Sequence, residues 1–140
     1  MKLALPDGYE LDDDRTRIDL DALHDFLANH AYWAQGRARE TVERHLREAQ
    51  RVVGLYHEDR LAGYTRTVTD GVAFAYLADV YVLPEHRGRG LGLELVRFTI
   101  DGGPYAGVKW LLHTKDAHEL YRKLGFGEPS VKVMERAGST

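Results

Sequence analysis

The stretch "VLPEHRGRGLG", residues 82 to 92, decides the fold of this chain. In it an apolar run ends at a proline, and three glycines then alternate with arginine and leucine before a helical pattern begins. Glycine in a loop costs conformational entropy, so it usually serves a tight turn or a close approach of the backbone to another group. The spacing therefore predicts a loop whose backbone another molecule can approach.

The composition indicates an ordinary globular protein and excludes several kinds of site. The chain has 140 residues, of which 44% are hydrophobic and 29% charged, and its formal net charge is −3. We expect a single domain over residues 1–140. The charge gives no basic field that would attract nucleic acid, so no nucleic-acid partner is expected. Because there is no cysteine, disulfides, thiolate metal sites and a cysteine nucleophile are excluded, and no metal site is predicted.

The sequence gives no sign of membrane insertion or export. No apolar run approaches the roughly 20 residues that a membrane-spanning helix needs. The N-terminal stretch "MKLALPDGYELDDD" turns acidic after a few apolar residues, which is unlike a signal peptide. We therefore expect a cytoplasmic protein without a membrane partner. A homodimer is compatible with the sequence, which does not set the oligomeric state.

Hydrophobic periodicity predicts a strand, two helices, three strands, a helix, a strand, a helix and a final strand. Asp19 and Asp116 are the expected N-caps of the first and last helices, Glu58-Asp59 is the expected turn of a hairpin, and the run 72–82 is expected to be buried on both faces. Early hairpins followed by a crossover helix predict a mixed sheet. The expected strands are 8–11, 51–57, 60–70, 72–82, 108–112 and 131–135, and the expected helices are 17–30, 40–50, 91–100 and 116–125.

A buried strand, a glycine-rich turn and a helix start together form a geometry that binds phosphate. The first amides of a helix have no intrahelical partner, and the helix dipole places partial positive charge there. Glycines let successive amides converge on an anion, and Arg87 and Arg89 add positive charge. The spacing matches neither G-x-G-x-x-G nor a P-loop. A solvated turn that holds no ligand is the alternative interpretation.

Two segments of the chain resemble the GNAT superfamily of acyl-CoA-dependent N-acetyltransferases. The first, "VLPEHRGRGLG", is similar to the family's acetyl-CoA-binding motif, V-x-P followed by R/Q-x-x-G-x-G/A, with Arg87, Gly90 and Gly92 in the defined positions. The second, "LLHTKDAHELYRKLGF", is similar to the strand–helix segment that ends in A-x-x-x-Y-x-x-x-G-F. Two motifs in the correct order are more specific than one. The defined positions of the second motif are filled by Ala117, Tyr121, Gly125 and Phe126.

The resemblance implies a GNAT fold in the α/β (α+β) class and acetyl-CoA as co-substrate. This fold is a mixed, mostly antiparallel sheet of six to seven strands with a splayed central strand, flanked by about four helices. A bulge at Ala78-Asp79 is implied, as is an oxyanion donor, the amide near Val80. Thr114 stands where relatives often carry an asparagine that contacts the pantetheine or phosphate region of CoA. Threonine offers a hydroxyl but no amide, so this contact is carried over to Thr114 only weakly. The implied acetyl-CoA-binding residues are Val80, Tyr81 and Val82 for the pantetheine arm, and Arg87, Gly88, Arg89, Gly90, Leu91 and Gly92 for the pyrophosphate.

The chemistry of acetyl transfer points to three candidate catalytic residues. Tyr121 corresponds to the family tyrosine that reaches the sulfur of CoA, which implies a general acid, and its alternative role is an aromatic anchor. Asp79 lies in an apolar strand, where a charge is costly unless it is paired. It is either a general base or the partner of an arginine such as Arg66. His113 is the second candidate base, because imidazole titrates near neutrality.

The acceptor pocket is expected between the first two helices, as the resemblance implies. Tyr32 and Trp33 lie in a polar loop there and are candidate pocket-lining residues, although Trp33 could instead plug the core. The acids 12–14 either attract a cationic amine or lie solvated. We expect transfer of an acetyl group to a primary amine of a small molecule, by direct attack in a ternary complex. The alternatives are a protein or peptide N-acetyltransferase and a non-catalytic acyl-CoA sensor.

Overall fold

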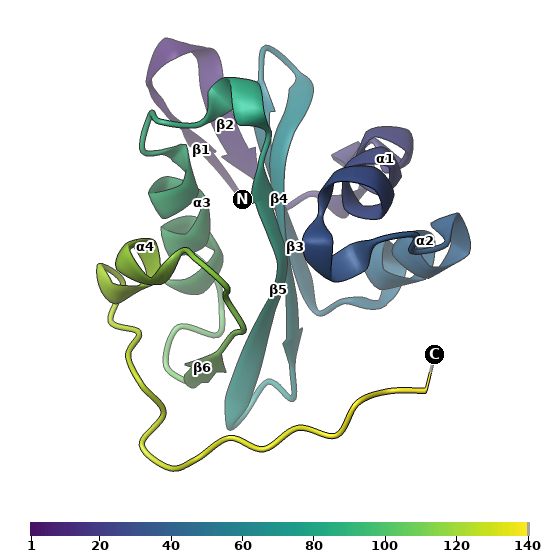
Figure 1. Ribbon diagram of the computed structural model, residues 1–140. Coiled ribbons are helices and arrows are strands. Elements are labelled where there is room, and N and C mark those ends of the chain that lie inside the picture. Colours follow the sequence, from purple (N-terminus) through teal and green to yellow (C-terminus); the bar gives the residue numbers. More distant parts are fainter. Residues whose placement is uncertain (140) are drawn as a thin grey trace.

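A six-stranded sheet organises the chain, and helices cover both of its faces (Figure 1). The computed structural model describes residues 1–139. All neighbouring strands pair antiparallel except β5 and β6, which are parallel. The predicted mixed, mostly antiparallel sheet with four helices is thus confirmed. In sheet order the strands are β1 (Lys2–Ala4), β2 (Tyr9–Asp12), β3 (Arg51–His57), β4 (Arg60–Thr69), β5 (Phe74–Val82) and β6 (Lys109–Leu111), and the helices are α1 (Leu20–His30), α2 (Arg39–Glu48), α3 (Leu91–Ile100) and α4 (His118–Arg122).

Local sequence signals explain several of these boundaries. Asp19 caps α1, since its carboxylate accepts a hydrogen bond from the Ala22 amide at 3.1 Å. Glu58 and Asp59 both have positive φ, 48° and 70°, as a two-residue turn of type I′ requires in a hairpin. Both predictions are confirmed. The expected cap at Asp116 is wrong, because the N-cap of α4 is Ala117 and its amide donates to the Thr114 hydroxyl at 3.1 Å.

Two helical layers enclose the sheet and divide the core. On one face α1 and α2 pack, and the rings of Phe26 and Tyr81 stack with centroids 3.9 Å apart. On the other face α3 buries Leu95 against Leu55, and α4 closes the neighbouring part of that layer. Within residues 1–139, no helix is both long enough and apolar enough to cross a bilayer.

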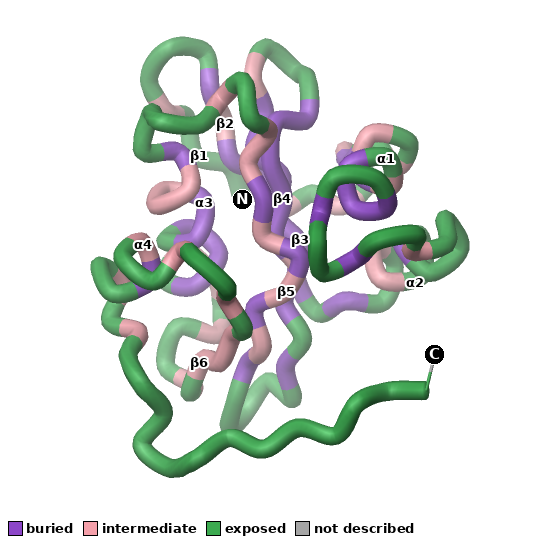
Figure 2. Tube along the Cα trace, viewed as in Figure 1, coloured by how far each residue is buried: buried purple, intermediate pink, exposed green. Residues whose placement is uncertain are grey.

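Two sequence expectations about strands are wrong, and one strand was missed. The segment 131–135 forms no strand: it has no sheet partner within residues 1–139, and residues 127–139 are exposed, as Figure 2 shows. A β-rich sequence needs a neighbouring strand to pair with, which the sequence alone does not supply. β1 was missed because its three residues are all exposed and carry no apolar alternation. β5 is not fully buried on both faces: from Ala75 to Val82 buried and half-buried residues alternate along it, so the helices cover each face only in part.

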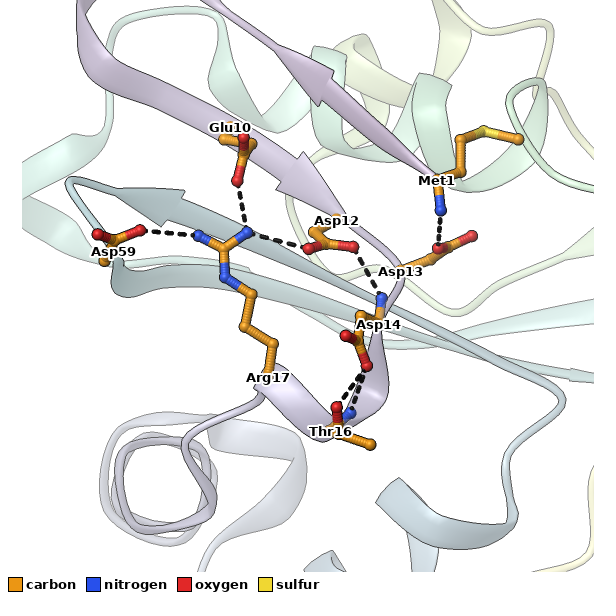
Figure 3. A network of polar contacts seen from close by, with 8 residues as sticks. All are labelled: Met1, Glu10, Asp12, Asp13, Asp14, Thr16, Arg17 and Asp59. Atoms are coloured by element: carbon orange, nitrogen blue, oxygen red, sulfur yellow. Dashed lines mark hydrogen bonds and ion pairs between the residues drawn. The ribbon is translucent and has the colours of Figure 1, made fainter.

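An ion-pair network fastens the N-terminal strands to the β3–β4 hairpin (Figure 3). The Arg17 guanidinium donates to Glu10 at 2.5 Å, to Asp12 at 3.0 Å and to Asp59 at 3.2 Å. Asp14 accepts from the amide and hydroxyl of Thr16. These acids are therefore occupied by partners within the chain, and Asp12 is buried rather than solvated.

Candidate active site

A bulge at Asp79-Val80 opens β5 and overlaps the Ala78-Asp79 position that the resemblance implied. Tyr64 pairs with Tyr81 and Arg66 pairs with Ala78, so a single residue of β4 faces two residues of β5. Asp79 has a φ of 55°, in the left-handed region. Beyond Tyr76 the edge of β5 that faces away from β4 has no strand partner among the described residues. The central strand is therefore splayed from β6, as expected.

The bulge also changes which face of the sheet the side chains enter. Leu77 packs in the core under α3 and α4. A regular strand would place Asp79 on that same face, because strand side chains alternate with a period of two. Instead, the Asp79 carboxylate lies on the opposite face, where it contacts Trp33 and Arg37. Through these two hydrogen bonds Asp79 connects β5, at its opened edge, to the segment between α1 and α2.

The loop before α3 presents free backbone amides. Gly88 and Gly90 have φ values of 81° and 77°, and Gly90 is the N-cap of α3 without a side-chain cap. The amides of residues 88–90 donate to no other group within residues 1–139. A Cβ built at Gly88 or Gly90 would meet nothing within 4 Å, so backbone conformation rather than crowding requires glycine there. Free amides at the start of a ten-residue helix fit an anion such as a diphosphate.

The other residues of this loop have distinct surroundings. The Arg87 Nε donates to the carbonyl of Val82 at 2.8 Å and so ties the loop to the end of β5. A Cβ on Gly92 would lie 3.1 Å from Leu120 Cδ1, so Gly92 allows α3 and α4 to approach closely. Arg89 is exposed, and Leu91 is buried in the core under α3. The sequence did not distinguish these packing roles from contact with a ligand.

Tyr121 of α4 packs beside the opened part of β5, in a cluster that also holds Val80. Its ring packs with Leu77 and Val96 and meets Phe126 edge-on, with centroids 5.7 Å apart. The hydroxyl has no hydrogen-bond partner within residues 1–139 and is not among the buried polar atoms, so it reaches solvent. Burial raises the pKa of Tyr121 to about 12. The phenol therefore keeps its proton at physiological pH.

The turn between α1 and α2 lies beside the bulge of β5. Tyr32 and Trp33 lie in a short 3₁₀ turn and remain 54% and 40% exposed, so Trp33 does not plug the core. The Trp33 Nε1 donates to Asp79 Oδ1 at 2.9 Å. The Lys115 ammonium lies 5.2 Å from the centroid of the Tyr32 ring, and Tyr32 contributes to the raised pKa of Tyr121. This turn thus extends from the bulge of β5 to the segment that carries Tyr121.

Asp79 is paired with arginines rather than free to take a proton. Its Oδ2 accepts from Arg37 at 2.9 Å and from Arg66 at 2.8 Å, and the carboxylate is 2% exposed. Burial raises the pKa of Asp79, but the two guanidinium groups and the hydrogen bonds outweigh it, so the net pKa is lowered. Of the two roles that the sequence left open, the geometry favours the arginine partner.

The remaining candidates lie at the periphery of this region. His113 is exposed, and its contacts are with the Tyr76 hydroxyl at 2.5 Å and with Glu135 at 3.2 Å. The Thr114 hydroxyl accepts a hydrogen bond from the Ala117 amide and so stabilises the start of α4. None of these hydrogen bonds and ion pairs joins His113 or Thr114 to Tyr121.

Sequence reasoning missed Arg37 and His45. A buried carboxylate needs a cationic partner, which was the available signal for an arginine, but Arg37 lies 42 residues from Asp79 and its proximity arises only in the fold. His45 has a buried Nδ1 without a partner within residues 1–139. Burial, followed by Arg66 and Arg37, lowers its pKa. Its imidazole is therefore held in the neutral form.

Comparison with known proteins assigns the chain to a family. Residues 20–126, more than half of the chain, match the model of the "Acetyltransferase (GNAT) family". The crystal structure of a "putative acetyltransferase belonging to the gnat family" from Xanthomonas campestris pv. campestris superposes with a TM-score of 0.88 at 31% identity and covers 96% of each chain. A "probable acetyltransferase" from Staphylococcus aureus superposes with a TM-score of 0.71 at 27% identity and covers 93% of this chain and 99% of its own.

A fungal relative matches over a shorter segment. "Putative acetyltransferase FG08082" of Gibberella zeae is 42% identical over 66 residues, and the match covers 45% of this chain but only 37% of the fungal protein. The family assignment therefore depends on the family model and on the structure from Xanthomonas. This chain belongs to the GNAT family of acetyltransferases, whose members generally use acetyl-CoA as co-substrate.

Proposed function

We propose that this chain, acting as a single domain over residues 1–140, transfers the acetyl group of acetyl-CoA to the primary amine of a small molecule, with both substrates bound together. The observation that carries the proposal is the opened edge of β5: Arg87 links its end to the loop of free amides before α3, and its Val80 packs in the same cluster as Tyr121. An acyl-CoA needs these three features together: donors for its diphosphate, an edge for its extended arm and a proton donor for its sulfur.

The residues would divide the binding of acetyl-CoA as follows. The amides of residues 88–92 would hold the diphosphate, because they have no acceptor in the described part of the chain and lie at the positive end of the α3 dipole. The edge of residues 80–82, which has no strand partner within residues 1–139, would pair with the pantetheine arm in the manner of an added strand. Arg87 would keep the loop and this edge in register through its bond to Val82.

Tyr121 would supply the proton that the leaving sulfur needs. The amine nitrogen bonds to the acetyl carbon, the carbon–sulfur bond breaks, and the sulfur takes the phenolic proton. With its pKa raised to about 12, Tyr121 stays protonated until the thiolate leaves. The proton that the attacking nitrogen loses as the amide forms then restores the phenol, so that overall one proton passes from nitrogen to sulfur. Asp79 would act as a positioning residue that fixes Trp33, because both of its oxygens are already occupied.

A thiol-release assay with acetyl-CoA against amines, amino acids, polyamines and peptides tests this function. Calorimetry on Gly90→Glu tests the loop, because the new carboxylate would repel the diphosphate. Gly71→Glu is the matched control: Gly71 has a φ of 79° in a turn outside the loop, so strain and charge are the same. We expect acetyl-CoA binding to be lost in Gly90→Glu alone. Equal binding by both variants, or no transfer to any amine by the wild type, would contradict the proposal.

A further inference from the structure

Two guanidinium groups converge on one carboxylate beside the bulge of β5. Arg37 and Arg66 each donate a single hydrogen bond to the same oxygen of Asp79, while Trp33 occupies the other oxygen. A guanidinium carries five N–H donors, so most donors of both arginines are not used by Asp79. The cluster therefore combines two positive charges with one negative charge.

The unused donors of this cluster face solvent. The side chains of Arg37 and Arg66 are only 18% and 14% exposed. Their other nitrogens have no partner within residues 1–139 and are not among the buried unpartnered atoms. A mostly buried positive charge that is not balanced is unfavourable unless an anion pairs with it. An anionic ligand would supply that missing partner.

The groups around the cluster do not cancel its excess charge. His45 of α2 is held neutral by its lowered pKa, and Tyr76 of β5 is held in its phenol form by a raised pKa. Lys115 lies against Tyr32 and adds positive charge. Glu135 lies 3.2 Å from His113 and its side chain is 77% exposed, so solvent screens its charge. The cluster thus keeps one uncompensated positive charge.

The position of the cluster places an anion within the acceptor region. Trp33 contacts Asp79, and its neighbour Tyr32 lies toward Tyr121 on the same turn. A ligand held by the two arginines would extend along the side chains of Trp33 and Tyr32 toward the opened edge of β5. We propose that the acceptor is an amine that also carries a carboxylate, bound by the free donors of Arg37 and Arg66. This inference rests on the acetyl transfer proposed above and names its substrate class.

The chemistry favours a carboxylate over a phosphate. The planar fork of a guanidinium matches the two oxygens of a carboxylate. One uncompensated positive charge balances a carboxylate, whereas a phosphate monoester would bring nearly two negative charges. An amine that carries a phosphate is therefore the competing outcome of the test.

Binding of reaction products tests this inference without any turnover. Calorimetry in saturating CoA would compare N-acetylglycine, N-acetyl-β-alanine, N-acetyl-γ-aminobutyrate and N-acetylleucine with their neutral amides and with N-acetylphosphoethanolamine. We expect at least one acid to bind about tenfold or more tightly than its amide, as charge-assisted hydrogen bonds predict. Arg66→Met and Arg37→Met should each remove most of that preference. Arg66→Lys, which keeps the charge but loses the fork, should retain part of it.

Arg44→Met is the matched control, because Arg44 lies exposed on α2 and pairs with Glu48. It should leave the preference of the wild type unchanged. The inference is overturned if no acid binds better than its amide, if the preference survives both substitutions, or if only the phosphate binds. Because acetyl-CoA binding and amine turnover are measured separately, a failure of acetyl transfer and a failure of carboxylate recognition give different results.

Discussion

Replacing Asp79 by alanine is expected to destabilise the fold by about 3–5 kcal/mol, the usual result of removing one member of a buried ion pair. The side chain of Asp79 is 2% exposed and accepts three hydrogen bonds within 2.9 Å from Trp33, Arg37 and Arg66. Its removal leaves two mostly buried guanidinium groups beside each other without a counter-charge. Because domains of this size are stable by about 5–15 kcal/mol, the loss is a large share of the total.

Urea unfolding at pH 7, followed by circular dichroism, measures this loss. Asp79→Asn should lose less stability than Asp79→Ala, because the amide oxygen still accepts from Trp33 although the charge is gone. Glu48→Ala is the control, since it removes an exposed carboxylate that also pairs with an arginine, and it should leave the unfolding midpoint almost unchanged. A loss for Asp79→Ala no larger than that of Glu48→Ala would refute the reasoning.

The pH dependence of the same difference gives an independent test. The pKa of Asp79 is lowered in the folded protein, so the carboxylate contributes its full stability above its ordinary pKa of 3.8. That contribution is lost as the pH falls through the lower, folded value. The gap in stability between wild type and Asp79→Ala should therefore be constant near neutrality and narrow only below about pH 4. A gap that narrows between pH 7 and pH 5 would contradict the lowered pKa.

Three further predictions concern the site and the tail. Tyr121→Phe should lower kcat by about 100-fold or more while the Kd for acetyl-CoA stays close to wild type, as loss of a general acid predicts. Because the pKa of Tyr121 is about 12, its ionisation should cause no fall in the wild-type rate up to about pH 11. A fall at lower pH that the Phe variant lacks would contradict this role. Gly92→Leu should displace α4 and reduce turnover, because even a Cβ there lies 3.1 Å from Leu120, and Leu120→Ala should restore part of the loss if that contact is the cause. Deleting residues 128–140 should shift the melting temperature by no more than about 3 °C, since the described part of this tail is exposed, and a larger shift would show that it packs on the fold.

Much of the fold follows from local patterns, and the failures have physical reasons. The hairpin turn at Glu58-Asp59, the cap at Asp19 and the glycine loop before α3 are local, and the structure has all three. The strand expected over 131–135 fails because pairing is a property of two segments, and no strand among residues 1–139 pairs with this one. The expected full burial of β5 fails because burial depends on how the helices cover the two faces, which no local pattern gives.

The candidate site shows the same division between local and distant information. Gly88, Gly90 and Tyr121 could be singled out because short motifs carry them. The pairing of Asp79 with Arg66 was one of two alternatives, and only the geometry of the bulge favours it. The contribution of Arg37 depends on a turn between helices meeting a strand far along the chain, which no local pattern encodes.

The most direct test of the central claim is a crystal structure of the protein with coenzyme A. We expect the diphosphate oxygens to lie at hydrogen-bond distance, about 2.7–3.2 Å, from the amides of residues 88–92, and the pantetheine arm to lie along residues 80–82 of β5. Coenzyme A bound elsewhere, with those amides still unpartnered, would contradict the account.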